Sequence, residues 1–215
     1  MKPSAPARRT GGRLARLFKP AVFATCLLPM AALVGRGLAD RLGANPVEAV
    51  THSTGTWTLV LLCATLAVTP LRRITGWNAL ARIRRMLGLF AFFHACLHLA
   101  TWAWLDQWFE PADMIADVIK RPFITVGMAA FLLLLALALT STDAMMRRLG
   151  RRWSLLHRAS YVIAVLGVLH YTWDKAGKNL LVQPMIYAGV VAVLLGWRAW
   201  RHLRGRYAGS LRSSE

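Results

Sequence analysis

Four histidines in two apolar segments are the residues of this chain best suited to chemistry. His94 and His98 lie in FFHACLHLATW, and His157 and His170 lie near the two ends of LLHRASYVIAVLGVLHYTW. An ionisable side chain inside a bilayer is costly and is by default a functional candidate. The apolar segments carry no carboxylate, which argues against a proton relay and against a zinc site of histidine plus carboxylate. Neutral imidazoles on facing helices are typical axial ligands of haem iron.

Helical geometry assigns these histidines to different depths. His157 and His170 are 13 residues apart, which corresponds to about 20 Å along a straight helix and a difference in direction of about 140°. His94 and His98 are four residues apart and therefore share a face. Counted from Arg85, His98 is about 20 Å into the membrane. We therefore expect His98 and His170 to be partners at one level. His157 lies lower, and His94 is either its partner or a packed neighbour.

The other two histidines and the three cysteines predict no further site. His202 belongs to the basic C-terminal segment and is expected to be solvated. His52, in THSTG, is expected at the surface, with a role in capping or in lining a mouth as the alternative. Cys26, Cys63 and Cys96 show no CxxC spacing, so they are interpreted as buried apolar residues and not as a disulfide or zinc framework.

The composition indicates that the solvent of this protein is partly lipid. Of its 215 residues, 56% are hydrophobic and only 17% are charged, whereas a soluble domain carries about 25% charged residues. A membrane-spanning helix needs about 20 mainly apolar residues. Six segments approach this requirement, and they predict an all-α, polytopic membrane bundle of about six helices: residues 18–34, 55–69, 86–105, 122–140, 153–173 and 184–200.

The basic residues predict how the bundle is oriented. Connections rich in Lys and Arg alternate along the chain with connections poor in them, so that 21 basic residues lie on one side of the membrane and 6 on the other. Seven of the nine acidic residues lie on the side with few basic residues. Cytoplasmic loops carry the excess of Lys and Arg. Both termini are therefore expected in the cytoplasm, and the first span is expected to be retained as a helix and not cleaved as a signal peptide.

The outer connection LDQWFEPADMIADVIKRP permits two interpretations. Its apolar residues have helical spacing, which suits an amphipathic helix at the membrane interface. The alternative, which we favour from the sequence, is a surface turn packed on the bundle.

The charge distribution also limits the class of partner. A net charge of +18 would suit a nucleic-acid-binding protein, but the basic residues form short clusters between apolar runs, and this argues against nucleic acid and for membrane lipid. No internal repeat is apparent. We expect one transmembrane domain, residues 18–200, between a basic cytoplasmic N-terminus, residues 1–17, and a basic cytoplasmic tail, residues 201–215.

Several stretches together resemble a known family. They are GANPVEAVTHSTG, TPLRR, RRMLGLFAFFHACLHL, KRPFITVGM, ALTST, RRLGRRWSLLHRASYVIAVLGVLHYTW and QPMIYAG. Over residues 43–200 the chain is similar to the MsrQ family of the ferric-reductase-like transmembrane superfamily. Members are haem-bearing bacterial inner-membrane subunits that serve a periplasmic protein-methionine-sulfoxide reductase.

The resemblance implies cofactors and site residues. It implies haem b with iron ligands at His98, His157 and His170, and both one haem and two are compatible with this set. His94 is additional to the family's ligands. The resemblance also implies FMN near the cytoplasmic face, at Arg84 and Arg85. Independently, two arginines at a helix start suit a phosphate group, although the same pair also fits the positive-inside pattern.

The resemblance further implies a non-catalytic electron-transfer subunit. Electrons would come from the quinone pool or a cytosolic flavin reductase and leave to a separate, molybdenum-containing reductase that repairs oxidised periplasmic proteins. The chain shows no GxGxxG turn, so we expect no nicotinamide site of its own. Two alternatives stay open: a stand-alone ferric or quinone reductase of the cytochrome b type, and a small transporter that uses its histidines.

Overall fold

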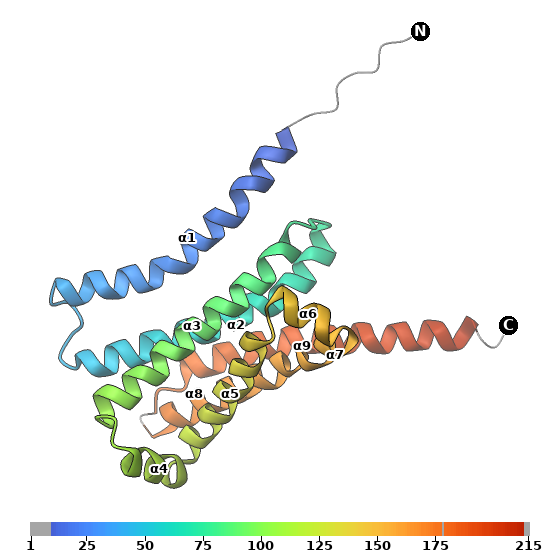
Figure 1. Cartoon of the computed structure of the whole chain (residues 1–215). Helices are drawn as coiled ribbons and strands as arrows, with labels where there is room; N and C mark the ends of the chain where they lie inside the picture. The colour runs from blue at the N-terminus through green and yellow to red at the C-terminus, as the bar shows by residue number, and fades with distance from the viewer. Residues whose placement is uncertain (1–9, 178, 213–215) are drawn as a thin grey trace.

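Long helices run back and forth in a single bundle in the computed structural model (Figure 1). The structure describes residues 10–177 and 179–212, with side chains described for 17–177 and 179–204, so parts of the predicted terminal segments 1–17 and 201–215 lie outside it. The elements are α1 (Thr10–Leu38), α2 (Pro46–Thr75), α3 (Leu80–Thr101), the π-helix η1 (Trp102–Asp106), α4 (Pro111–Lys120), α5 (Pro122–Leu139), α6 (Asp143–Leu149), α7 (Arg151–Leu156), α8 (Ala159–Ala176) and α9 (Val182–Arg212).

In the part of the chain that the structure describes, five helices are long and apolar enough to cross a membrane: Leu17–Leu38, Pro46–Thr75, Leu80–Asp106, Pro122–Leu139 and Val182–Arg204. The all-α, multi-span fold predicted from the sequence is confirmed. The remaining predicted span, residues 153–173, is divided into α7 and α8 by a break at His157 and Arg158. α8 is less apolar because its last turn contains Asp174 and Lys175, yet it packs along α5 in the bundle.

The ends of α2 show why helices start and stop where they do. The Asn45 side chain accepts a hydrogen bond from the Glu48 backbone N–H at 3.1 Å, and Pro46 follows at the first helical position. Both features favour a helix start. The helix ends at Gly76, whose φ of 69° is left-handed, and only glycine adopts this conformation without a steric cost.

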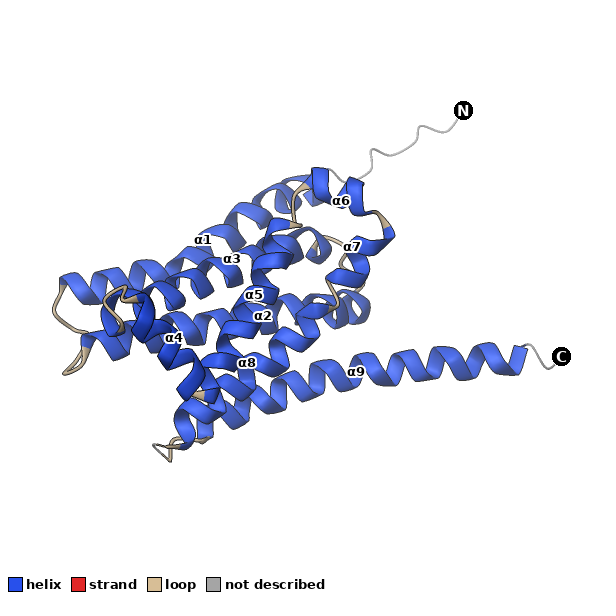
Figure 2. Cartoon of the chain, turned by 60° about the horizontal axis from the view of Figure 1, so that its bottom comes forward, coloured by secondary structure: helices blue, strands red, loops and turns tan. Residues whose placement is uncertain are grey.

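The centre of the bundle consists of two helix pairs, α2 with α3 and α5 with α8. Leu66 of α2, Ala91 of α3 and Ala164 of α8 have no exposed surface. Small residues such as Ala91 and Ala164 let the helices approach closely, as is usual in membrane bundles. α1 and α9 flank these pairs, and α9 continues well beyond the bundle (Figure 2).

α4 lies across one end of the bundle, between α3 and α5 (Figure 1). None of its residues is buried, and Ile115 and Ile119 are 61% and 75% exposed. The connection is a helix, so the favoured interpretation of it as a turn is wrong. Met114 and Val118 are half-buried whereas Ile115 and Ile119 are exposed, so this amphipathic helix contacts the bundle but is too short to enter its core.

Candidate functional site

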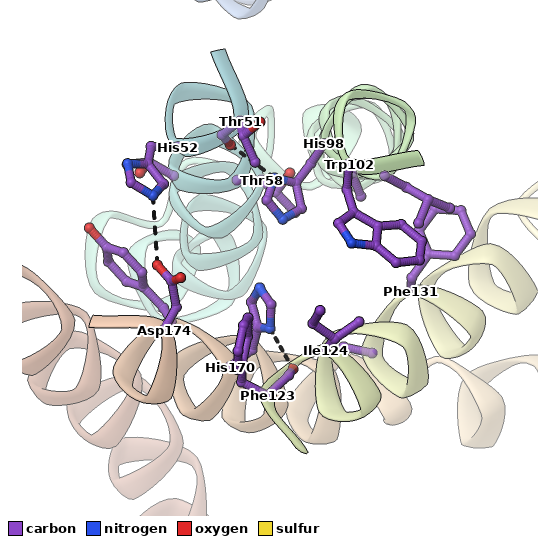
Figure 3. A pocket seen from close by; sticks show the side chains of 18 of the residues that line it. Thr51, His52, Thr58, His98, Trp102, Phe123, Ile124, Phe131, His170 and Asp174 are labelled. Carbon is purple, nitrogen blue, oxygen red and sulfur yellow. Dashed lines mark hydrogen bonds and ion pairs between the residues drawn. The ribbon is translucent and has the colours of Figure 1, made fainter. Parts of the chain in front are cut away.

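His98 of α3 and His170 of α8 face each other across a cavity at the α4 end of the bundle (Figure 3). Their ring centres are 6.0 Å apart and the ring planes are inclined at 80°. The structure thus brings together the two histidines that helical geometry assigns to one level.

Each of these two rings is fixed by a backbone carbonyl of a neighbouring helix. Nδ1 of His98 lies 2.9 Å from the carbonyl oxygen of Thr51, and Nδ1 of His170 lies 2.7 Å from that of Phe123. A carbonyl oxygen only accepts, so each Nδ1 must carry the proton and donate. The proton-free Nε2 of each ring is then the available ligand atom, which is the usual arrangement around metal-bound histidine.

Two glycines provide the space for these rings. A Cβ added at Gly55 of α2 would lie 3.0 Å from Nδ1 and Cε1 of His98, and one at Gly127 of α5 would lie 2.7 Å from Nδ1 of His170. Both distances are shorter than ordinary van der Waals contact. Glycine is therefore required at both positions for the imidazoles to lie against the helix backbones.

The two histidine sites have the same construction and the same spacing. Each histidine follows its carbonyl partner by 47 residues and its glycine by 43. The sequence shows no apparent repeat because few other side chains match between the pair α2–α3 and the pair α5–α8. The signal that was available is a Gly–x42–His spacing that occurs twice, in α2–α3 and in α5–α8.

The cavity between the histidines has a volume of about 550 Å³, which is within the usual range for cofactor pockets. Its walls are mainly apolar and aromatic, with Trp102, Phe123, Phe131, Leu134 and Ile163 among the lining residues. The π-helix η1 begins at Trp102, one turn after His98. Single π-helical turns of this kind are frequent at functional sites.

The donor set and its spacing fit haem iron with two axial histidines. Two metal–imidazole bonds of about 2 Å each, together with two ring radii of about 1 Å, place the ring centres about 6 Å apart. The observed separation of 6.0 Å agrees with this requirement. Within residues 17–177 and 179–204, no group of three His, Cys, Asp or Glu side chains could hold a bare metal ion instead.

A polar cluster lies at the mouth of the cavity. His52, predicted at the surface, lines the cavity beside Asp174. Its Nε2 is 2.8 Å from Nζ of Lys175 and 3.7 Å from the Asp174 carboxylate. Lys175 is itself buried and is 3.3 Å from Asp174. The alternative role of His52 at a mouth therefore fits the structure better than a plain surface position.

His157, the third predicted ligand, lies away from this cavity at the other end of α8. Its ring stacks on Trp153 at 3.9 Å, its Nδ1 is 3.1 Å from the Trp153 carbonyl oxygen, and its Nε2 is 3.5 Å from the Ser141 hydroxyl. Its ring neighbour is a tryptophan and not another histidine. Arg84 lies within electrostatic range of it.

Arg85 follows Arg84 in the first turns of α3 and forms an ion pair with Asp143 of α6. This guanidinium holds the pKa of the Asp143 carboxyl below its usual value. Because a carboxyl with a lowered pKa is ionised above that value, the pair persists at neutral pH and is lost only in acid. Arg84 is therefore within electrostatic range of His157, whereas Arg85 is engaged by the Asp143 carboxylate.

His94 does not contribute to the cavity. Its side chain is 1% exposed, and neither ring nitrogen makes a hydrogen bond to any described residue. The ring packs against Phe93 and lies near the Cys26 backbone of α1. The structure thus separates His94 from His98, although the two are one helical turn apart.

Comparison with known proteins agrees with this architecture. A family model described as the ferric-reductase-like transmembrane component matches residues 54–168. Relatives named protein-methionine-sulfoxide reductase heme-binding subunit MsrQ include those of Ralstonia nicotianae, 58% identical over 91% of both chains, and Bordetella parapertussis, 55% identical over 94% of this chain and 98% of the relative. The chain belongs to the MsrQ family. A third relative, from Herminiimonas arsenicoxydans, is 58% identical over 83% of both chains.

Membership in the MsrQ family confirms the resemblance seen in the sequence. The matched family is a transmembrane one and the relatives are bacterial, so the chain is a multi-pass protein of the bacterial inner membrane. The family match includes Gly55, His98 and Gly127 and ends two residues before His170.

Proposed function

We propose that this chain is a haem-binding membrane subunit that transfers electrons to a periplasmic methionine-sulfoxide reductase. The observation that carries the proposal is the facing pair of His98 and His170, 6.0 Å apart in an apolar cavity. Their Nδ1 atoms are held by carbonyls, so the Nε2 atoms of His98 and His170 would hold the iron of haem b. When bound, the haem supplies reversible one-electron oxidation and reduction.

The residues of the chain perform the supporting tasks. Thr51 and Phe123 orient the imidazoles, and Gly55 and Gly127 let them approach the helix backbones. The mainly apolar and aromatic wall suits a large, delocalised redox group. The cavity lies at the end of the bundle that carries few cations, which would be the periplasmic end. That position suits delivery of electrons to a soluble, molybdenum-containing partner.

His157, Arg84 and Arg85 belong to the electron-entry side in this proposal. His157 would contribute a ligand at a second, cytoplasmic position, and Arg84 and Arg85 would bind the phosphate of FMN. The electrostatic interaction of Arg84 with His157 supports this grouping. The ion pair of Arg85 with Asp143 means that Arg84 is the more available of the two arginines. Electrons would arrive from the quinone pool or from a cytosolic flavin reductase.

An absorption spectrum of the purified full chain, oxidised and then reduced with dithionite, tests the haem proposal. We expect a haem Soret band that shifts on reduction. Substitution of His98 or His170 by Ala should abolish most haem binding, because one ligand then remains in an apolar cavity. His202→Ala is the matched control, since His202 is exposed on α9 and should keep the full spectrum.

Other outcomes would change the assignment. Normal haem content in both the His98→Ala and the His170→Ala variants would contradict the ligand pair. Reduced protein that cannot pass electrons to a methionine-sulfoxide reductase, but reduces ferric chelates or quinones, would instead favour the stand-alone reductase. FMN content measured on the same preparations tests Arg84 and Arg85.

A further inference from the structure

Arginines greatly outnumber acids at the end of the bundle opposite the cavity. The described residues there include Arg72 and Arg73 of α2, four arginines of α6 and α7, and Arg198, Arg201 and Arg204 of α9, whereas Asp143 is the described carboxylate at this end and is paired with Arg85. Positive-inside topology accounts for the excess in general. It does not account for where two of these guanidinium groups are placed.

Arg73 and Arg201 gather around a single ring, that of Trp197. The guanidinium carbon of Arg73 is 5.8 Å from the ring centre and that of Arg201 is 5.4 Å from it. Neither group forms an ion pair with a carboxylate in the described part of the chain. Arg198, one residue after Trp197, also lies within electrostatic range of Arg73. Several cations thus gather around one ring, and a bound anion in contact with them would reduce their mutual repulsion.

The surface of α9 below these arginines is apolar and faces outward. Ile186, Val190 and Val193 are 59%, 40% and 71% exposed. With Trp197 and Arg201 they follow one another at intervals of three or four residues, so all five lie along one side of the helix. α9 is on the outside of the bundle (Figure 2). This side therefore presents apolar side chains, then an aromatic ring, then a cation. The three groups match the acyl chains, the interfacial region and the anionic phosphate of a phospholipid in the same order.

We propose that Arg73, Trp197 and Arg201 form a binding site for the phosphate of an anionic phospholipid. Its acyl chains lie along Ile186, Val190 and Val193, and its phosphate accepts hydrogen bonds from both guanidinium groups. Basic pockets between membrane helices commonly bind such headgroups. The site is separate from the histidine cavity and does not depend on the haem proposal.

Phosphatidylglycerol titrated into the full chain in detergent, with bound lipid counted by native mass spectrometry, tests this site. We expect the Arg73→Gln/Arg201→Gln variant to bind phosphatidylglycerol about 30-fold more weakly than the unaltered chain. Trp197→Leu keeps both charges but removes the ring, and should weaken binding about 5-fold. Arg147→Gln/Arg148→Gln is the matched control, because it removes two exposed α6 arginines at the same end and should have little effect.

Three results would overturn the proposal. One is equal weakening in the control variant, which would indicate a general charge effect. Another is equal binding of zwitterionic phosphatidylcholine. The third is binding of inorganic phosphate as tight as that of phosphatidylglycerol, which would show that the site takes a free anion and makes no use of acyl chains.

Discussion

Each imidazole of the cavity depends on two groups from a neighbouring helix, a carbonyl oxygen and a glycine. The carbonyls of Thr51 and Phe123 set the tautomer and direction of the rings. Gly55 and Gly127 set how deeply the rings lie, because any Cβ there would occupy the position of ring atoms. The geometry of the two imidazoles is therefore decided by residues outside the pair, an arrangement that is common around metal-bound histidine.

Alanine substitutions at these glycines should disturb the site while leaving every histidine in place. Gly127→Ala would put a Cβ 2.7 Å from His170 Nδ1, and Gly55→Ala one 3.0 Å from His98 Nδ1. We expect about a 10-fold or larger fall in haem affinity for each, measured by titration with haem. Gly88→Ala is the control, since its Cβ would make an ordinary 3.9 Å contact with Thr65. Unchanged affinity in both variants would disprove the positional role of the glycines.

At the scale of helices, a proline and an arginine connect α2 to α9. Pro70 lies inside α2 and has no N–H, so the carbonyl of Leu66, four residues earlier, lacks its usual helical donor. The guanidinium of Arg198 donates to this carbonyl and also to that of Leu194 at 3.0 Å. It also lies 5.1 Å from the centre of the Tyr161 ring of α8. Arg198 thus joins three helices at a point where the backbone of one is incomplete.

Loss of this connection should be detectable as a double-mutant effect. Arg198→Met leaves the Leu66 carbonyl without a donor, and we expect the free energy of unfolding to fall by about 1–3 kcal/mol. In a Pro70→Ala background the new backbone N–H of residue 70 can donate to the Leu66 carbonyl. Arg198→Met should then lower the free energy of unfolding by less. Denaturant unfolding of the four proteins in detergent measures the difference. An equal loss of unfolding free energy in both backgrounds would contradict the idea that Arg198 replaces the donor that Pro70 lacks.

At the scale of the whole molecule, the two ends of the bundle differ in chemistry. The α4 end holds the histidine cavity with the His52, Asp174 and Lys175 cluster at its mouth. The opposite end holds His157, Arg84 and an excess of arginine. Because anionic headgroups and the positive-inside rule favour arginine in the cytoplasm, the asymmetry predicts that the cavity opens to the periplasm.

Reporter fusions test this orientation in the cell. Alkaline phosphatase, active only outside the inner membrane, should be active after Gly177 and inactive after Gly76. Green fluorescent protein should fluoresce at the C-terminus and after Gly76. Active phosphatase after Gly76 would invert the topology and place the cavity in the cytoplasm.

The sequence by itself determined the class of fold, the approximate spans and the pairing of His98 with His170 at one level. These follow from apolar length and from the regular rise of a helix, which are local properties of the chain. It also determined the family, because the matching stretches extend over most of the chain. The break at His157 was not predicted, and the sequence left the α4 connection open between an interfacial helix and a surface turn, since both depend on competition between a segment and its neighbours for burial.

Only the tertiary structure decided how the histidines are used. His94 and His98 share one helix face, yet one is buried near α1 and the other faces the cavity. The roles of Gly55 and Gly127 require ring atoms from residues 43 positions away to lie against them. A contact of this kind depends on the angle and distance between packed helices, and the periodicity of a single helix carries no information about either.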